Sequence, residues 1–516
     1  MDPYGTEKGK EMQKNQFFDV IIIGGGSAGC VAAARLSEDP KRRVLLLEAG
    51  PDPSPLPAMI ADGAGSNRPI LESDYVVMYP TKRKIDGSEY YPLSGRILGG
   101  GSSINMMGVS RPTQYDLDRW ESLGNTGWSY EDCLPVLNRI ETDEDFGGLP
   151  YHGSTGPITV KRGLALNGNL APPMQAFVDQ AVALGYPITP DSNVPTRFGL
   201  SPSASNVKDG KRQSTAVAYV GPARNRKNLV IVGDAHVLAL KTEGRRVTSV
   251  QYELNGEALM ASADTFVLSA GTYHSPQVLM LSGIGPVDEL QRLGVKVIHQ
   301  MEGIGQNYQD HAAVNMTFEG TGEFSPDWVV AGFQLVYKTN DNLPVGNFHI
   351  YMRAPIGIEG LNPMMPVAMN LVEQKSRGRV YLNSTDPYEL PIIDDGMLQH
   401  PDDVADMLNA MHFVHDFMQN DLMRPYYGDL ILPEQEDNWA QYAQSTYDSH
   451  HHGSGTCMMG KASDPMAVVD SGLKMHGMAN LYVADASIIP TVPHAATNMT
   501  CMMIGERLAD FVKDAK

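Results

Sequence analysis

Residues 17–36 have the sequence FFDVIIIGGGSAGCVAAARL, in which an apolar run, a glycine-rich turn and a helix-forming segment follow one another directly. The run Phe17–Ile23 has the length and composition of a parallel strand buried on both faces. The segment Cys30–Leu36 favours a helix, and Arg43–Leu47 favours a second buried strand. This order of strand, turn, helix and strand is typical of the first unit of a doubly wound α/β domain.

The turn carries Gly24, Gly26 and Gly29, and an acidic residue, Glu48, follows the second predicted strand. Glycines at this spacing allow a tight turn, close approach of the backbone to a pyrophosphate and close packing of the helix on the strand. The helix N-terminus adds free N–H groups and a partial positive charge, and the carboxylate can accept hydrogen bonds from ribose hydroxyls. The pattern predicts a dinucleotide site, without distinguishing FAD from NAD, formed by Gly24, Gly26, Ser27, Ala28, Gly29 and Glu48.

The composition is ordinary for a soluble protein that handles a small molecule. The 516 residues leave room for more than one core, and the formal net charge of −20 opposes binding to nucleic acid or to an anionic membrane surface. The four cysteines, Cys30, Cys133, Cys457 and Cys501, lack metal-binding spacing, which favours reduced thiols. The N-terminal segment lacks the apolar core of a signal peptide, and no apolar run is long enough to span a membrane. We therefore expect a soluble, cytoplasmic protein.

Three further apolar runs, Leu229–Val232, Thr265–Leu268 and Asn480–Val483, have the character of buried strands although they lie far apart in the sequence. A sheet assembled from them is discontinuous in sequence and is closed by the C-terminal segment. The stretches between them have a different texture, with alternating segments and helical runs such as Val404–Met418. This texture predicts a second domain with a mixed sheet and helices.

Four longer segments carry a family resemblance: Gly95–Trp120 (GRILGGGSSINMMGVSRPTQYDLDRW), Gly271–Gly285 (GTYHSPQVLMLSGIG), Met301–His311 (MEGIGQNYQDH) and Val468–Pro490, which ends in VADASIIP. In order and separation they resemble the signature segments of the glucose-methanol-choline (GMC) oxidoreductases. The likeness spans nearly the whole chain and implies an α/β fold, with a discontinuous Rossmann-like FAD-binding domain and an α+β substrate-binding domain whose sheet is mostly antiparallel. We place the FAD-binding domain at residues 1–154, 207–310 and 450–516, and the substrate-binding domain at residues 155–206 and 311–449.

The resemblance also implies that FAD is the cofactor. Consecutive glycines at 99–101 leave room for backbone beside a flat ring system, and small polar side chains follow them. In some family members a histidine in this loop is bonded to the flavin; Ile104 stands at the matching position here, so we predict non-covalent FAD. Outside the first turn, the predicted FAD contacts are Arg96, Gly100, Gly101, Ser102, Asn105, Met106, Val237, Asp485, Ala486 and Asn498.

Two C-terminal segments, His450–Gly460 (HHHGSGTCMMG) and Asn498–Arg507 (NMTCMMIGER), match the catalytic positions of the family and select His452 and Asn498. Oxidation of an alcohol removes an O–H proton and passes a C–H hydride to flavin N5. Histidine titrates near neutrality and suits the base, and an asparagine amide can orient the substrate oxygen. This His–Asn pair resembles that of choline-oxidising enzymes and furan-alcohol oxidases.

The remaining residues near these segments carry weaker indications. We expect Met107, His450 and His494 at the substrate pocket and a structural role for His311. Met458 replaces the Arg or Lys that the family usually has in this segment.

No metal site is predicted. Consecutive side chains diverge, so the three histidines at 450–452 do not easily share one ion. His412 and His415 have helical i, i+3 spacing, but no carboxylate or cysteine accompanies them at a spacing that would complete a site.

The function that follows is FAD-dependent oxidation of a small primary alcohol, with aromatic and furanic alcohols as one class, to the aldehyde. Electrons pass to O2 or to a quinone- or dye-like acceptor. Choline-type or pyridoxine-type dehydrogenases and oxidases stay open, as does a hydroxynitrile-type lyase. Choline binding needs a carboxylate or an aromatic cage, which the sequence does not locate. The expected partners are the alcohol and the acceptor, with a homodimer compatible and with neither nucleic acid nor membrane insertion.

Overall fold

The first sheet is built on the predicted strand–turn–helix–strand unit. The computed structural model describes residues 16–63, 68–82, 90–162, 170–321, 332–357 and 362–515. The strands of this sheet are β1 (Gln16–Ile23), β2 (Val44–Leu47), β12 (Leu229–Val232), β13 (His236–Glu243), β14 (Arg246–Leu254), β15 (Glu257–Leu268) and β26 (Leu481–Val483). Their order is β12-β2-β1-β15-β14-β13, with β26 beside β15. All pairs are parallel except β13–β14 and β14–β15.

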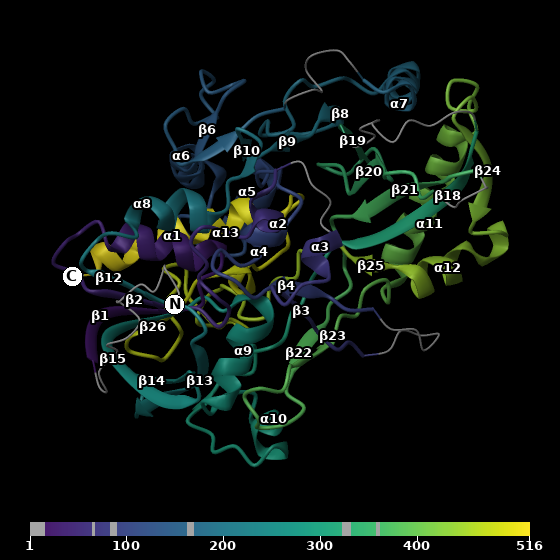
Figure 1. Ribbon diagram of the computed structural model, residues 1–516. Coiled ribbons are helices and arrows are strands. Elements are labelled where there is room, and N and C mark those ends of the chain that lie inside the picture. The colour runs from purple at the N-terminus through teal and green to yellow at the C-terminus, as the bar shows by residue number, and fades with distance from the viewer. Residues whose placement is uncertain are drawn as a thin grey trace.

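Helices α1 (Ser27–Leu36) and α13 (Thr497–Asp514) pack against each other over this sheet (Figure 1). Their backbones approach closely because the facing residues are small. A Cβ atom on Gly505 would lie 2.5 Å from the Ala28 carbonyl oxygen and 2.9 Å from Cβ of Val31. The first and last helices of the described chain thus belong to one layer, as a discontinuous domain requires.

The second sheet is antiparallel throughout its described strands. Its order is β24-β18-β21-β20-β19-β8, with β25 beside β18. The strands are β8 (Gly199–Pro202), β18 (Ala312–Gly320), β19 (Phe333–Tyr337), β20 (Phe348–Met352), β21 (Met364–Leu371), β24 (Tyr427–Leu432) and β25 (Asp448–Ser449). Three helices accompany it: α7 (Pro172–Ala183), α11 (Pro401–Met418) and α12 (Trp439–Thr446). This sheet and α11 lie on the right of Figure 1, away from the first sheet.

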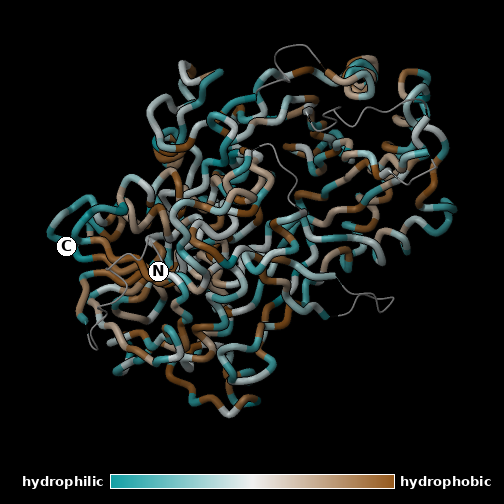
Figure 2. The backbone as a smooth tube through the Cα atoms, in the orientation of Figure 1, coloured by the Kyte–Doolittle hydropathy of each residue, from teal (hydrophilic) through white to brown (hydrophobic). Residues whose placement is uncertain are grey.

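Each sheet has its own hydrophobic core. Figure 2 shows hydrophobic segments gathered along the parallel strands of the first sheet, and hydrophilic segments on many outer loops. In the second core, Phe348, Ile350 and Met352 of β20 are buried. Side chains alternate across a strand, so the intervening residues of β20 face the other side of the sheet.

The predicted fold class is confirmed, with a Rossmann-like first sheet and an antiparallel second sheet. The predicted strand Thr265–Leu268 is the end of a longer strand, β15, whose first half pairs with β14. The described strands of the second sheet all lie within residues 155–206 and 311–449. The exact domain boundaries stay a prediction.

Shorter elements connect the two sheets and complete the described chain. The helices are α2 (Ala58–Ala61), α3 (Arg68–Leu71), α4 (Gly101–Ile104), α5 (Gln114–Ser122), α6 (Tyr130–Ile140), η3 (Ala216–Val220), α8 (Gly221–Ala223), α9 (Gly271–Leu281), α10 (Val287–Arg292), η4 (Glu436–Asn438) and η5 (Ala486–Ile488). The strands are β3 (Val76–Met78), β4 (Leu93–Gly95), β5 (Gly108–Val109), β6 (Glu141–Asp143), β7 (Ile158–Val160), β9 (Ala204–Ser205), β10 (Val207–Lys208), β11 (Lys211–Arg212), β16 (Ile284–Gly285), β17 (His299–Gln300), β22 (Arg379–Tyr381) and β23 (Ile392–Asp394).

Candidate active site

A cavity of about 1850 Å³ opens where the parallel strands of the first sheet end. Ile23 at the end of β1, Glu48 after β2, Ser269 after β15 and Asp485 after β26 all line it. Because the carboxyl ends of parallel strands meet at one edge of a sheet, distant parts of the chain converge there. Strands β19 and β20 of the second sheet contribute another wall. The cavity therefore has one end on each sheet.

The glycine-rich turn forms part of the first-sheet end. Gly24 has a φ of +101°, and a Cβ there would lie 2.3 Å from the Ser269 carbonyl oxygen. Gly29 faces the strand, where a Cβ would lie 2.0 Å from the Gly24 carbonyl oxygen. Gly26 precedes α1, which has no side-chain cap, so the N–H groups of its first turn are available to a ligand. Gly24, Gly26 and Ser27 line the cavity, whereas Ala28 and Gly29 support the turn from behind.

Glu48 is a buried carboxyl group at the same end of the cavity. It accepts hydrogen bonds from the backbone N–H groups of Gly25 and Gly50, both at 2.8 Å. Burial raises its pKa to about 7. Its oxygens keep further lone pairs for ligand hydroxyls. A buried carboxyl beside an uncapped helix N-terminus fits the ribose and phosphates of the dinucleotide half of FAD.

The loop after β4 supplies the next wall, and its glycines allow close approach. Gly100 has a φ of +50°, and a Cβ there would lie 2.8 Å from Cα of Gly26, whereas Gly101 faces open space. The Asn105 carbonyl oxygen Oδ1 accepts from Nη1 of Arg212 at 2.8 Å, which leaves its amide nitrogen as a donor. The remaining predicted contacts on the cavity wall are Arg96, Met106, Val237, Asp485 and Ala486.

Ser102, a predicted FAD contact, lies behind the glycine loop. Its side chain is buried and does not line the cavity. The Ser102 hydroxyl donates to the Gly99 carbonyl at 2.6 Å and accepts from the Thr215 backbone N–H at 3.1 Å. It therefore holds the glycine loop against the segment before η3.

His311, His450 and His452 form a compact group in the cavity wall. Nδ1 of His452 lies 2.9 Å from Nδ1 of His311 and 3.3 Å from Nδ1 of His450. Nε2 of His311 lies 3.0 Å from the Pro493 carbonyl oxygen, and Nε2 of His450 lies 2.8 Å from the Tyr351 hydroxyl. His311, which we expected to be structural, thus contacts the predicted base directly.

The Pro493 carbonyl determines where the protons lie in this group. A carbonyl oxygen only accepts, so Nε2 of His311 carries the proton. In the neutral ring, Nδ1 of His311 is then an acceptor, and Nδ1–H of His452 donates to it. The hydrogen-bond pattern assigns the neutral His452 ring a lone pair on Nε2. His452 is therefore held in the tautomer that can accept a proton at Nε2.

Burial keeps these rings neutral. It lowers the pKa of His311 and of His450 to about 3, and it lowers the pKa of His452 well below the usual value, with the neighbouring histidines adding to the effect. The backbone N–H of His452 donates to the buried Asp310 carboxylate at 2.9 Å. Asp310 also accepts from the Tyr308 hydroxyl at 3.0 Å. The carboxylate fixes the backbone of the histidine loop.

Asn498 lies in the first turn of α13 and lines the same cavity. Its Oδ1 accepts from the Ser27 hydroxyl at 2.8 Å, which leaves its amide nitrogen as a donor. Helix α13 has no side-chain cap, so its first N–H groups add a partial positive charge at this wall. The two predicted catalytic residues thus reach one cavity from separate segments.

Two of the three predicted substrate-pocket residues, Met107 and His450, line the cavity, but His494 does not. The His494 ring is buried, with Nδ1 2.6 Å from an Asp116 carboxylate oxygen and Nε2 3.4 Å from Glu373. Burial alone would lower its pKa, but these carboxylates raise it to about 9. His494 is therefore a buried ion-pair partner, because Asp116 draws its ring away from the cavity.

Strand β20 carries further cavity-lining residues that were not predicted from the sequence. His349 and Tyr351 line the cavity, and Arg353, the residue after the strand's end, lines it as well. They alternate with the buried core residues of β20. The period-2 pattern in residues 348–353 was the available signal.

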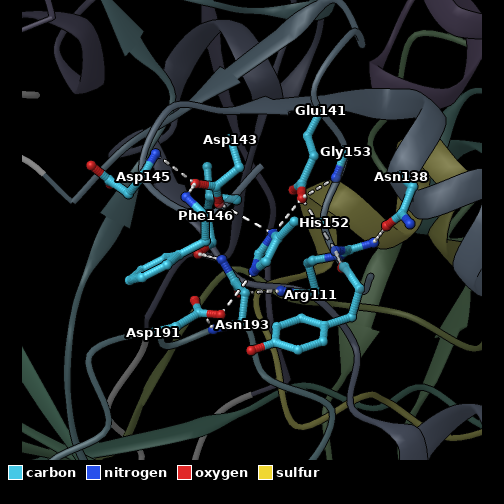
Figure 3. A network of polar contacts seen from close by, with 12 residues as sticks. Arg111, Asn138, Glu141, Asp143, Asp145, Phe146, His152, Gly153, Asp191 and Asn193 are labelled. Atoms are coloured by element: carbon cyan, nitrogen blue, oxygen red, sulfur yellow. Dashed lines mark hydrogen bonds and ion pairs between the residues drawn. The ribbon is translucent and has the colours of Figure 1, made fainter. Parts of the chain in front are cut away.

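A second buried polar cluster lies outside the histidine group (Figure 3). Nδ1 of His152 lies 2.6 Å from Glu141, and Nε2 lies 2.8 Å from Asp191. Burial alone would lower the pKa of His152, but these hydrogen bonds raise it to about 9. The cluster joins four carboxylates to three basic groups: Glu141, Asp143, Asp145, Asp191, Arg111, Arg162 and His152.

Two GMC oxidoreductase family models match this chain. A GMC oxidoreductase N-terminal model matches residues 18–313, and a GMC oxidoreductase C-terminal model matches residues 374–505. An oxygen-dependent choline dehydrogenase of Staphylococcus xylosus is 33% identical, with 97% of this chain and 95% of the relative covered. The mitochondrial choline dehydrogenase of Homo sapiens is 32% identical, with coverage of 96% and 90%.

Solved structures resemble the whole fold. Pyridoxine 4-oxidase from Mesorbium loti has a TM-score of 0.89 and 29% identity, and covers 96% of this chain and 98% of its own. A formate oxidase variant from Aspergillus oryzae RIB40 has a TM-score of 0.87 and 25% identity, with coverage of 98% and 99%. None of the helices in the described ranges combines the length and apolarity needed to cross a membrane.

Proposed function

The chain belongs to the GMC oxidoreductase family and is an FAD-dependent oxidoreductase acting on CH–OH groups, and from this premise we propose that it oxidises a small primary alcohol to the aldehyde. His452 is the proposed base, and Asn498 orients the substrate oxygen. The observation that carries the proposal is the hydrogen bond from Nδ1 of His452 to Nδ1 of His311, which leaves Nε2 of His452 free to accept a proton.

His452 and Asn498 have different proposed roles in the reaction. FAD, when bound, supplies the hydride acceptor. His452 takes the alcohol proton at Nε2 as the C–H bond breaks, which avoids a free alkoxide. The Asn498 amide nitrogen donates to the substrate oxygen, and its Oδ1 is already held by Ser27. Ile104, buried beside the glycine loop, offers no atom for a bond to the cofactor, which supports non-covalent FAD.

The electron acceptor belongs to the same proposal. O2 is one candidate, since a relative is named an oxygen-dependent choline dehydrogenase and a structural neighbour a pyridoxine 4-oxidase. A quinone-like acceptor is the other. Anaerobic reduction followed by admission of air separates them, because an oxidase recovers its oxidised spectrum rapidly.

Substitution of His452 by Gln tests the base. We expect the variant to bind FAD and to lose about 10²- to 10⁴-fold in the rate of flavin reduction by alcohol, measured by anaerobic stopped-flow absorbance. His412→Gln, at an exposed position on α11, is the control and should keep the wild-type rate. Near-normal reduction by the His452→Gln protein would remove His452 from the mechanism.

A further inference from the structure

The wall of the cavity formed by β20 is a row of polar side chains. His349 and Tyr351 lie two residues apart on this strand, and Arg353 follows at the same spacing. All three line the cavity. The hydroxyl of Tyr351, the middle residue of the row, lies 2.8 Å from Nε2 of His450, which in turn contacts the proposed base His452.

Arg353 brings a positive charge to this wall. Within the described residues, its guanidinium makes neither an ion pair nor a side-chain hydrogen bond, and only its backbone N–H is bonded, to the Pro366 carbonyl at 2.9 Å. The positive charge of Arg353 helps to lower the pKa of His450, after burial. A half-buried guanidinium without a carboxylate is a strong donor set for an anion.

His349 provides a second, independent indication of a ligand. Its side chain belongs to a residue that is only 7% exposed, and its Nε2 atom is buried without a hydrogen-bond partner in the described structure. A buried unpaired polar atom costs free energy unless a ligand satisfies it. His349 lines the same cavity as Arg353.

The charges of the cavity wall differ in sign from those of the chain. The chain has a net charge of −20. Apart from Arg162, which is paired with Asp143 and Asp191, the described lining has four basic and three acidic groups: Arg96, Lys161, Arg197 and Arg353 against Glu48, Asp448 and Asp485. Glu48 and Asp485 are bound by backbone N–H groups on the first sheet, and Asp448 is exposed. No buried described carboxylate therefore faces Arg353 from the cavity lining.

We propose that the preferred substrates are primary alcohols that carry an anionic group, with Arg353 binding the anion and His349 adding a hydrogen bond. This inference rests on the proposed alcohol oxidation at His452. A quaternary ammonium alcohol would instead place its cation beside the guanidinium, where charges of like sign repel. This arrangement of charges therefore disfavours choline as a substrate.

Matched alcohols test the proposal. The probes are 4-(hydroxymethyl)benzoate, its neutral isostere 4-(hydroxymethyl)benzamide, and choline. With the FAD-loaded enzyme under anaerobic conditions, we expect kcat/KM for flavin reduction to be about 10-fold or more higher for the benzoate than for the benzamide, and lowest for choline.

Variants assign the preference to Arg353. Arg353→Met should lower kcat/KM for the benzoate by about 10- to 100-fold and change that for the benzamide by less than about 2-fold, and Arg353→Lys should restore part of the preference. Arg424→Met, at an exposed position shortly before β24 and outside the cavity, should leave kcat/KM for both probes unchanged. Equal loss with both probes would mean a structural role and would overturn the assignment.

The outcomes separate the inference from the proposed function. Reduction by the benzamide or by choline at least as fast as by the benzoate would overturn the anion preference and leave alcohol oxidation standing. Absence of reduction by all three, and by a wider panel of primary alcohols, would overturn both. Retention of yellow FAD by each variant shows that the comparison is made on folded enzyme.

Discussion

A single backbone carbonyl, that of Pro493, sets the proton positions around the proposed base. His311 transmits this constraint to His452, since its Nε2–H is held by the carbonyl and its Nδ1 must therefore accept. His311 is a positioning residue in this account. The reacting nitrogen would be Nε2 of His452.

Substitution of His311 by Phe removes the acceptor for Nδ1–H of His452. We expect kcat to fall by about 10- to 100-fold and the pH profile of flavin reduction to change, because the tautomer is no longer held. His311→Gln, which keeps a carbonyl acceptor, should recover part of the rate. A His311→Phe enzyme with the wild-type pH profile would contradict the assignment of the tautomer.

The sequence located some site residues better than others, for physical reasons. His452 and Asn498 were predicted from their match to the family's motifs, and both line the cavity. His494 was misplaced because its partner, Asp116, lies 378 residues away, and only the tertiary fold brings that carboxylate to it. The alternating pattern of residues 348–353 could have predicted the polar row on β20. The sequence does not show which charged groups face this row in the fold.

At the scale of elements, the contact between α1 and α13 holds the dinucleotide turn in place. Gly505→Ala should destabilise the protein by about 1–3 kcal/mol and weaken FAD retention, because the added Cβ would lie 2.5 Å from the Ala28 carbonyl oxygen. Urea unfolding and the flavin content after gel filtration measure the two effects. Gly148→Ala is the control, since a Cβ there meets nothing within 4 Å. Equal stability of the two variants would contradict the account of this contact.

The elements themselves were predictable to different degrees. Buried parallel strands such as β1, β2 and β12 have continuous apolar runs, so the sequence alone indicated them. Strands β13 and β14 are partly exposed, with mixed residues, and their pairing with β15 is a tertiary property. The antiparallel order of the second sheet likewise depends on pairings between distant segments.

For the whole molecule, buried histidines make stability depend on pH in both directions. The pKa values of His152 and His494 are raised to about 9, so their stabilisation is complete below pH 6.5 and is lost as pH rises through 9. The pKa values of His311 and His450 are lowered to about 3, so the unfolded chain binds more protons and stability falls as pH drops below 6.5.

The free energy of unfolding should therefore be highest near neutral pH. At pH 9.5 it should be lower by about 3 kcal/mol. Urea unfolding at pH 5, 7 and 9.5 measures it. The double variant His152→Gln/His494→Gln should be less stable at pH 7 and lose less stability between pH 7 and 9.5. A wild-type stability that stays level or rises over that interval would contradict the role of these ion pairs.

Anaerobic mixing of the FAD-loaded protein with primary alcohols tests alcohol oxidation directly. The alcohols include benzyl alcohol, hydroxymethylfurfural, pyridoxine, choline and 4-(hydroxymethyl)benzoate. The visible absorbance of the flavin is followed, and the effective alcohol is repeated with deuterium on its carbinol carbon. We predict loss of the absorbance, slowed by deuterium, with formation of the aldehyde. Unchanged absorbance with every alcohol would contradict it.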